Sequence, residues 1–342
     1  MDRMTIVSLD AMGGDAGPDV TIPAAEIALE ANPDLKLILV GDQELLTKRI
    51  ADLKPALAER VSIRHASQKV EMDESPSSAL RGKKDSSMRV AINLVKEGEA
   101  GACVSAGNTG ALMATARFVL KTLPGIDRPA ICTSIPSVEG HNHILDLGAN
   151  VDSSSDHLFQ FAVMGSVLAS AVDNIESPRV ALLNIGEEEI KGNDQVKRAA
   201  SILAASELNY IGYIEGDQVF KGGSDVVVCD GFVGNVMLKT TEGVAKMISH
   251  FMKEAFMRGP LSKLAAVIAM PVLKSFRKRI DPRRYNGASL LGLRGIVVKS
   301  HGGADAFSFA NAIKIATLEV SKSVPERIHS ELETLLTRRE AV

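Results

Sequence analysis

Residues 180–186 read VALLNIG, an apolar run that ends in a glycine and leads into a polar turn. The pattern recurs as LKLILVG at 35–41, ILDLG at 144–148 and DVVVCDG at 225–231. Because apolar and polar residues do not alternate in these runs, they predict strands that are buried on both faces, as in a parallel sheet. Eight such runs end before a glycine, at Gly13, Gly41, Gly107, Gly148, Gly186, Gly216, Gly231 and Gly302.

Stretches with helical periodicity separate these runs, for example at residues 87–97, 109–121 and 304–322. Alternating strands and helices are typical of α/β proteins, so we predict a Rossmann-like, three-layer α/β/α sandwich with a mainly parallel sheet. Although 342 residues would allow two domains, we expect a single α/β domain over 1–342 with a helical extension at 244–285. Residues 74–87 are polar and turn-rich, which predicts a surface loop.

The composition argues against several classes of protein. With 45% hydrophobic and 24% charged residues it is typical of a globular protein, not of a disordered or polytopic membrane protein. Aromatic residues make up 4%, Trp is absent and the net charge is −3, so we expect no nucleic-acid partner. Three widely spaced cysteines without a Cys-x-x-Cys pair predict a cytoplasmic protein with buried thiols. We recognise no signal peptide, and the longest uncharged apolar stretch, 264–273, is too short to span a bilayer.

Glycine-rich turns follow the predicted strands. In parallel α/β sheets ligands bind outside the carboxyl ends of the strands, where glycine lets the backbone approach a ligand and the free N–H groups of a helix start attract anions. A small anion such as phosphate is the expected ligand. The six turns are DAMGGDAGP (10–18), SAGNTGA (105–111), LDLGAN (145–150), NIGEEEIKGND (184–194), DGFVGN (230–235) and SHGGADAF (300–307).

Simpler interpretations exist for each motif. A glycine after a strand is common as turn chemistry alone, and Lys191 can equally be a solvated charge. His141 and His143 alternate and could share one strand face, but two histidines without a third ligand are a weak metal signal, so we interpret them as a solvated face. Cys229 follows three valines, which favours a buried thiol over a nucleophile.

Familiar cofactor and nucleophile motifs are missing from the sequence. It contains no G-x-G-x-x-G dinucleotide fingerprint, no G-x-x-x-x-G-K-[ST] phosphate loop and no G-x-S-x-G elbow. We therefore expect neither a nicotinamide cofactor nor a serine nucleophile, and we assign no metal site.

Together and in this order, the six turns resemble those of the bacterial PlsX family, the acyl-ACP:phosphate acyltransferases of phospholipid synthesis. The resemblance runs from about residue 5 to about residue 315 and is weakest over 258–284 and beyond Val324. It implies a fold related to phosphate acetyltransferases and isopropylmalate-type dehydrogenases, usually as a homodimer. It also implies transfer of a long acyl chain from acyl carrier protein to inorganic phosphate. The acyl phosphate formed would be used by a membrane glycerol-3-phosphate acyltransferase.

The chemistry implied by this resemblance agrees with the motifs, because phosphate is itself the nucleophile and the protein need not supply one. The resemblance and the chemistry assign Lys191 to orienting phosphate or the oxyanion, and Asn235 to donating hydrogen bonds at the same centre. Asp230 is assigned to orienting one of these two. The remaining assignments concern substrate binding by the turns, at Gly13, Gly14, Gly107, Asn108, Gly110, Asn150 and His301.

Two alternative functions are compatible with parts of the sequence. A metal- and nicotinamide-dependent decarboxylating dehydrogenase on the same fold needs clustered aspartates, and here they are dispersed. A non-catalytic adaptor that recruits acyl carrier protein to membranes would leave the gathering of glycine turns unexplained.

The segment 258–284 is strongly basic. It contains eight Lys or Arg and one acid, Asp281, for a charge of +7, so the rest of the chain carries −10. Interleaved apolar residues favour docking on the inner face of the cell membrane, as interfacial helices do. The same residues would also suit binding of acyl carrier protein or packing against a second subunit, and the sequence alone does not distinguish these two from the membrane.

Overall fold

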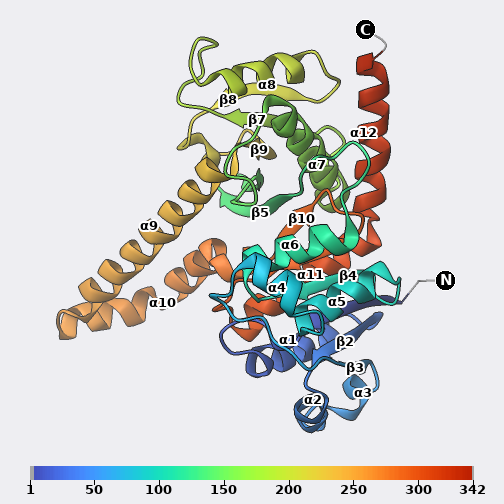
Figure 1. Ribbon diagram of the computed structural model, residues 1–342. Helices are drawn as coiled ribbons and strands as arrows, with labels where there is room; N and C mark the ends of the chain where they lie inside the picture. Colours follow the sequence, from blue (N-terminus) through green and yellow to red (C-terminus); the bar gives the residue numbers. More distant parts are fainter. Residues whose placement is uncertain (1–3, 341–342) are drawn as a thin grey trace.

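The computed structural model describes residues 4–340, with the backbone alone at 277, 278, 280 and 337–340. Within that range eleven strands form one sheet in the order β3-β2-β1-β4-β11-β10-β5-β6-β9-β7-β8 (Figure 1). All eight predicted runs form strands, and β3, β5 and β10 are additional. The strands are β1 (Thr5–Asp10), β2 (Leu35–Gly41), β3 (Val61–His65), β4 (Ala102–Ser105), β5 (Ala130–Ser137), β6 (Gly140–Leu145), β7 (Val180–Leu183), β8 (Tyr210–Ile214), β9 (Val226–Val228), β10 (Ala288–Leu291) and β11 (Ile296–Lys299).

The sheet consists of two parallel blocks that run in opposite directions. Strands β3, β2, β1, β4 and β11 are parallel neighbours, and so are β6, β9, β7 and β8. Antiparallel pairing of β10 with β11 and β5, and of β5 with β6, joins the blocks. The fold is thus the predicted α/β class with a mostly parallel sheet. The two reversals arise at β5 and β10, neither of which was among the eight predicted runs.

Helices cover both faces of this sheet. Helices α1 and α11 pack together on one face, and α5 and α6 lie on the other. Accordingly Val7 and Leu9 share a core cluster with Phe309, whereas Cys103 shares one with Ile92. The helices are α1 (Pro18–Ala31), α2 (Gln43–Ile50), α3 (Pro55–Ala58), α4 (Pro76–Gly82), α5 (Ser87–Lys96), α6 (Thr109–Leu120), α7 (Ser155–Asp173), α8 (Asp194–Ala204), α9 (Gly231–Met257), α10 (Pro260–Ile280), α11 (Ala306–Ser321) and α12 (Val324–Glu340), with 3-10 turns η1 (Gln218–Phe220) and η2 (Pro282–Tyr285).

The glycine turns also contain the residues that start the following helices. Asn108, Asn193, Asp230 and Asp305 cap α6, α8, α9 and α11, each accepting a backbone N–H of the first turn. Each turn therefore fixes the direction in which its helix leaves the strand.

The prediction of a loop over 74–87 was wrong for residues 76–82, which form α4. The Ser75 hydroxyl caps this helix by accepting from the Ser78 N–H, and Pro76 occupies its first position. Ala79 is buried and α4 packs against α6, so tertiary packing and the cap order a stretch whose composition indicates a loop.

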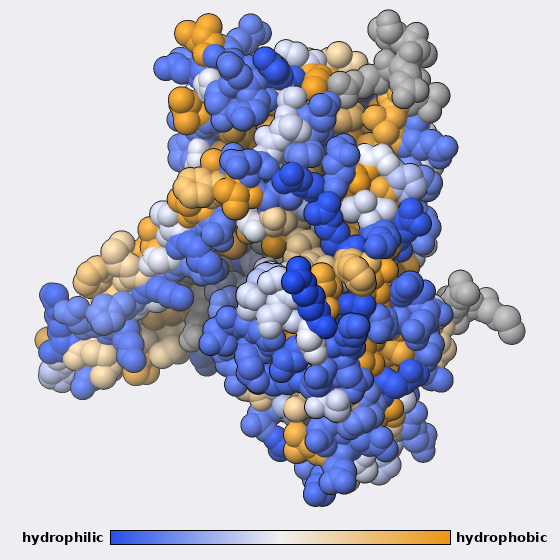
Figure 2. Space-filling model, viewed as in Figure 1, coloured by the Kyte–Doolittle hydropathy of each residue, from blue (hydrophilic) through white to orange (hydrophobic). Residues whose placement is uncertain are grey.

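Helices α9 and α10 project from the body as an antiparallel pair (Figure 1). Figure 2 shows apolar and hydrophilic residues side by side along this projection. Among residues 4–340 no helix is both long and apolar enough to cross a membrane. The predicted helical extension at 244–285 covers the outer half of α9, all of α10 and η2.

Candidate functional site

Three of the glycine turns meet in space, beyond the carboxyl ends of β1, β4 and β11. The Asp15 N–H donates to the Gly302 carbonyl at 3.0 Å, which joins the first turn to the last. A Cβ added at Gly13 would lie 2.9 Å from the Gly107 nitrogen. Gly14 has a φ of 84°, and its added Cβ would lie 2.9 Å from the Ala106 Cβ. Side chains at these positions would push the three turns apart, so glycine is required for their convergence.

A buried group of polar side chains lies at the strand ends beneath these turns. The Ser105 hydroxyl donates to Asp10 Oδ2 at 2.6 Å and accepts the Gly107 N–H at 3.0 Å. The Lys299 ammonium donates to the Ala106 carbonyl at 3.3 Å. Asp10 Oδ1 is buried without a hydrogen-bond partner among the described residues. The site therefore contains a buried lysine just outside the predicted turns, and a buried aspartate that begins the first of them but was not assigned a role.

Burial controls the charge of both groups. Burial lowers the pKa of Lys299 to about 8, against the opposing attraction of Asp10 and Asp15. Burial also raises the pKa of Asp10, although hydrogen bonds from Ser105 and the backbone oppose it. Each is a charged residue at the last position of an otherwise apolar strand, and that is the signal by which the sequence could have identified them.

The predicted substrate-binding residues Asn108 and Gly110 stand at the start of α6. The side-chain oxygen Oδ1 of Asn108 accepts the Ala111 N–H and caps the helix. Its side-chain amide nitrogen donates to the Met72 carbonyl at 2.7 Å and the Glu74 carbonyl at 3.0 Å. Asn108 thus holds the segment before α4 against the turn. His301 is exposed at the edge of the same group, where its Nδ1 accepts the Gly303 N–H at 3.1 Å.

A second group forms where β6 and β9 end. Asp146 is buried, and its Oδ2 accepts the Asn150 N–H at 2.7 Å and the Asn150 side-chain amide at 3.0 Å. The Asn150 amide also donates to the Pro129 carbonyl at 2.9 Å, so this predicted substrate-binding side chain holds the turn itself together. Gly234 packs on Asp146, where no Cβ fits, and a Cβ added at Gly148 would lie 3.5 Å from the Asn235 Cβ. The exposed Asn235 therefore stands over Gly148.

Of the three predicted catalytic residues, Asp230 and Asn235 lie together at the start of α9, and Lys191 lies on another turn. Asp230 accepts the Val233 N–H at 2.9 Å as the cap of α9, one turn before Asn235. Lys191 lies on the turn after β7, where its exposed side chain folds over Gly186. In the described part of the chain, no hydrogen bond or ion pair joins the Lys191 side chain to Asp230 or Asn235.

Helix α9 links the two groups. Lys239 stands one turn after Asn235, and its positive charge adds to burial in lowering the pKa of Lys299. The charge of α9 thus acts on the group beneath the first three turns. The site extends from the Asp10 group to Asn235, across the junction of the two blocks.

The predictions for the cysteines are confirmed, and the prediction for one of the two histidines is not. All three cysteines are free and buried as predicted, and burial raises the pKa of the Cys229 thiol, which makes it a poor nucleophile. The interpretation of His141 and His143 as a solvated face was wrong for His143, which is buried. Both histidines bond to Asp173, a partner 30 or more residues away that local spacing cannot indicate.

Comparison with known proteins shows the family to which this chain belongs. The sequence model of the "Fatty acid synthesis protein" family matches residues 5–327. A phosphate acyltransferase of Alkalilimnicola ehrlichii is 63% identical over 341 residues, covering 100% of both chains. One from Methylococcus capsulatus is 62% identical, covering 98% of this chain and 99% of its own. The chain belongs to the PlsX family of phosphate acyltransferases. The protein is thus an acyltransferase that transfers acyl groups to phosphate, as the resemblance implied.

Solved structures confirm the fold expected for this family. A phosphotransacetylase from Streptococcus pyogenes superposes with a TM-score of 0.62 at 17% identity, covering 93% of this chain and 94% of its own. A 4-hydroxythreonine-4-phosphate dehydrogenase from Klebsiella pneumoniae gives 0.55 at 17% identity, covering 94% and 100%. At such identities the likeness concerns the fold alone. Membership of the phosphate acyltransferase family decides against the adaptor and dehydrogenase alternatives.

Proposed function

We propose that this protein transfers a long acyl chain from the thioester of acyl carrier protein to inorganic phosphate, giving acyl phosphate for phosphatidic acid synthesis. The observation that carries the proposal is the convergence of three glycine turns over the buried Lys299, in a chain of the phosphate acyltransferase family. Backbone donors above a buried cation are suited to a small, doubly charged anion.

The phosphate end of the site is assigned to the Asp10 group. The backbone N–H groups of Gly14 and Gly302 donate to no protein acceptor among residues 4–340, so they are available to an anion. With a pKa of about 8, Lys299 is mostly charged at neutral pH and attracts phosphate. Asn108 contributes by fixing the segment before α4 beside this cradle.

The thioester end is assigned to the start of α9. An Asn235 amide donating to the carbonyl oxygen stabilises the negative charge that develops there, an effect of about 10²–10³ in rate for one donor. Gly148 beneath it leaves room for the thioester. Asp230 acts as a positioning residue, because capping α9 fixes the direction of Asn235. Lys191, exposed on its separate turn, is assigned to orienting the phosphate or the oxyanion through its positive charge.

The reaction needs no protein nucleophile. A phosphate oxygen attacks the thioester carbon and forms a C–O bond, and the resulting oxyanion collapses as the C–S bond breaks and the carrier thiolate leaves. The buried, protonated Cys229 agrees with direct attack. Neither a cofactor nor a metal ion takes part in this mechanism.

Mass spectrometry of the products tests the proposal. Purified protein incubated with acyl-ACP and phosphate is expected to yield acyl phosphate and free carrier, and the NAD-linked absorbance with hydroxy acids is expected to stay silent. If the folded protein formed no acyl phosphate from acyl-ACP, acyl carrier protein would not be its acyl donor and the proposal would fail.

A homodimer is proposed through α9. Four apolar residues with helical spacing remain 45–59% exposed on it, namely Val244, Met247, Ile248 and Phe251. An apolar stripe of this kind on a projecting helix is typical of a helix that packs against another, and a second copy supplies an identical stripe.

Peripheral association with the inner face of the cell membrane is proposed through α10. Three of its apolar residues are more exposed than the four on α9, namely Leu261 at 82%, Ile268 at 73% and Val272 at 72%. Basic residues of 258–284 flank them, and each contributes about 1 kcal/mol near an anionic surface. This location would deliver acyl phosphate to a membrane glycerol-3-phosphate acyltransferase. Acidic acyl carrier protein is the competing occupant of the basic residues.

A further inference from the structure

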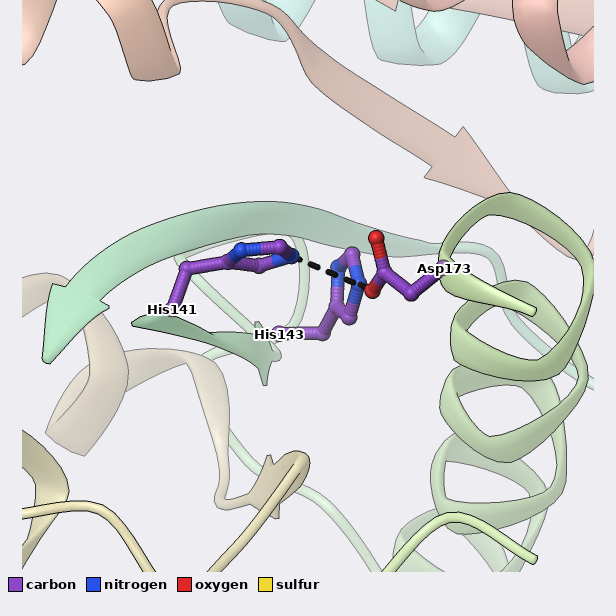
Figure 3. A group of neighbouring side chains, drawn as sticks. All are labelled: His141, His143 and Asp173. Carbon is purple, nitrogen blue, oxygen red and sulfur yellow. Dashed lines mark hydrogen bonds and ion pairs between the residues drawn. The ribbon is translucent and has the colours of Figure 1, made fainter. Parts of the chain in front are cut away.

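A cluster of two histidines and one carboxylate lies outside the acyl-transfer site (Figure 3). His141 and His143 are two residues apart in β6, so both side chains point to the same face of the sheet. Asp173 is the last residue of α7, which packs on that face. Its Oδ2 lies 3.1 Å from His141 Nε2 and 2.6 Å from His143 Nε2.

The three ligand atoms are spaced as a small metal ion requires. One atom from each residue lies within 4.8 Å of the other two. Ligands at Zn–N and Zn–O distances of about 2.0–2.1 Å in a tetrahedron stand about 3.3 Å apart. The separations of 3.1 and 2.6 Å already approach that value, so a small outward shift of the carboxylate would admit an ion.

Second contacts hold the ligands in place. The Ser134 hydroxyl lies 3.3 Å from His143 Nδ1, which leaves Nε2 for the shared centre, as is common for metal-binding histidines. The carbonyls at the carboxyl end of α7 add partial negative charge beside Asp173, which favours a cation. Lys322 donates to Asn174 at 2.9 Å and fixes the residue that ends this helix.

One side of the cluster is open. The cluster forms part of the wall of a cavity of about 250 Å³ that Cys132, Ser289 and Glu319 also line. A water molecule in this cavity can occupy a fourth ligand position.

We propose that His141, His143 and Asp173 form a binding site for a divalent transition metal ion, Zn²⁺ by preference, with a fourth position open to the cavity. Two imidazoles and one carboxylate match zinc, whereas Mg²⁺ and Ca²⁺ require more oxygen ligands than the cluster supplies. The site lies toward the opposite end of β6 from Gly148, so it does not belong to the acyl-transfer machinery. A bound ion would tie β6 to the end of α7 and stabilise the fold.

Calorimetric titration with Zn²⁺ and visible spectroscopy with Co²⁺ test the site on full-length protein freed of metal by a chelator. We expect one ion per chain, the absorption bands of four-coordinate cobalt, and a Tm that rises with Zn²⁺ concentration. Asp173→Asn and the half-exposed His141→Gln should each weaken binding at least tenfold. The matched control His250→Gln changes an exposed histidine of α9 and should bind like the parent protein.

Two results would overturn the proposal. One is the absence of stoichiometric binding by the folded parent protein, which would leave the cluster as a hydrogen-bonded group without a metal. The other is undiminished binding by both variants, which would locate the ion elsewhere. Should Asp173→Asn fail to fold, the His141→Gln variant alone tests metal binding. The His141 side chain is 35% exposed, so its loss removes little packing.

Discussion

At the residue scale, Lys299 shows how burial adjusts a charge for binding. Its ammonium lies among carbonyl oxygens, close enough to Asp10 and Asp15 for their charges to oppose the effect of burial. Because the pKa is about 8 and not the ordinary 10.5, the charge is lost within one or two pH units above neutrality. A phosphate site that depends on this cation must weaken over the same range.

We predict that the KM for phosphate rises as the pH increases through about 8, because Lys299 then loses its proton. Lys299→Met keeps most of the apolar stem and should raise that KM at least tenfold at pH 7, while flattening its rise with pH. Steady-state kinetics across pH 6.5–9.5 measure both effects. An unaltered KM and pH profile in the variant would remove Lys299 from phosphate binding.

Unlike the buried Lys299, Lys191 is exposed, and its side chain has no hydrogen-bond or ion-pair partner among the described residues. We predict that Lys191→Ala lowers turnover by about a hundredfold or more, on the scale of a lost oxyanion donor. Its Tm should hardly change, because no packing is removed. Near-normal turnover in the folded variant would assign Lys191 to the solvated surface.

Asn235 and Cys229 test the direct-attack mechanism together. Asn235→Ala should impair acyl phosphate formation about 10²-fold, because the developing oxyanion loses a donor. Cys229→Ser should remain active, since the thiol is buried and protonated. Inactivity of a folded Cys229→Ser protein, together with an acylated enzyme in the mass spectrum of the parent, would establish a covalent intermediate instead.

At the element scale, strands were predictable where burial on both faces leaves an uninterrupted apolar run. All eight runs that end in glycine form strands, from β1 to β11. The missed strands are β3, whose sequence VSIRH is half polar, β5, which contains Pro136, and β10, whose four residues ASLL include only two large apolar side chains. Two of these are the strands that reverse the sheet, so the opposite directions of the two blocks could not be predicted.

Prediction of the site from the sequence was limited in the same way as prediction of the strands. The glycine turns could be located from sequence, because each follows an apolar run. Asp10, Asp146 and Lys299 were not singled out, because a single charge at a strand end indicates either a buried polar group or merely the start of a turn, and only the fold shows that these three are buried. The association of His143 with Asp173 depends on α7 packing against β6, which no local pattern specifies.

The two projecting helices carry separable predictions. Replacing Val267, Ile268 and Val272 with Asp should abolish co-flotation with anionic liposomes, because three apolar contacts become charged. The protein should remain a dimer on sizing. As the matched control, Met247→Asp with Phe251→Asp on α9 should dissociate the dimer. Unchanged flotation, or monomers from the α10 variant, would make α10 a subunit interface.

At the scale of the whole molecule, charge is divided between the body and the projection. Segment 258–284, which contains α10, carries +7 and the rest of the chain, α9 included, carries −10, so the proposed docking on an anionic surface would be directed to this segment. The body must in turn accommodate several buried acids, including Asp10, Asp146 and Glu319. Buried acids make the stability of the fold depend on pH.

Glu319 gives the clearest test of this dependence. It is buried on α11, accepts a hydrogen bond from Ser289, and burial raises its pKa from 4.5 to about 7. Because the folded state then holds a proton that the unfolded state releases, this contribution to stability is fully present below pH 4.5 and is lost as the pH rises to about 7. Glu319→Gln keeps the shape without the charge.

We predict that Glu319→Gln stabilises the protein at pH 8 by up to about 3 kcal/mol, the equivalent of the pKa shift. At this chain length that corresponds to a few degrees in Tm. Near pH 3.5, about one unit below the unfolded-state pKa, the variant and the parent should melt together, because Glu319 is then mostly protonated in both the folded and unfolded states of the parent. Thermal melts of the variant and the parent at both pH values measure this difference in stability. A variant that is equally stabilised at both, or destabilised at pH 8, would show that Glu319 is charged and compensated within the fold.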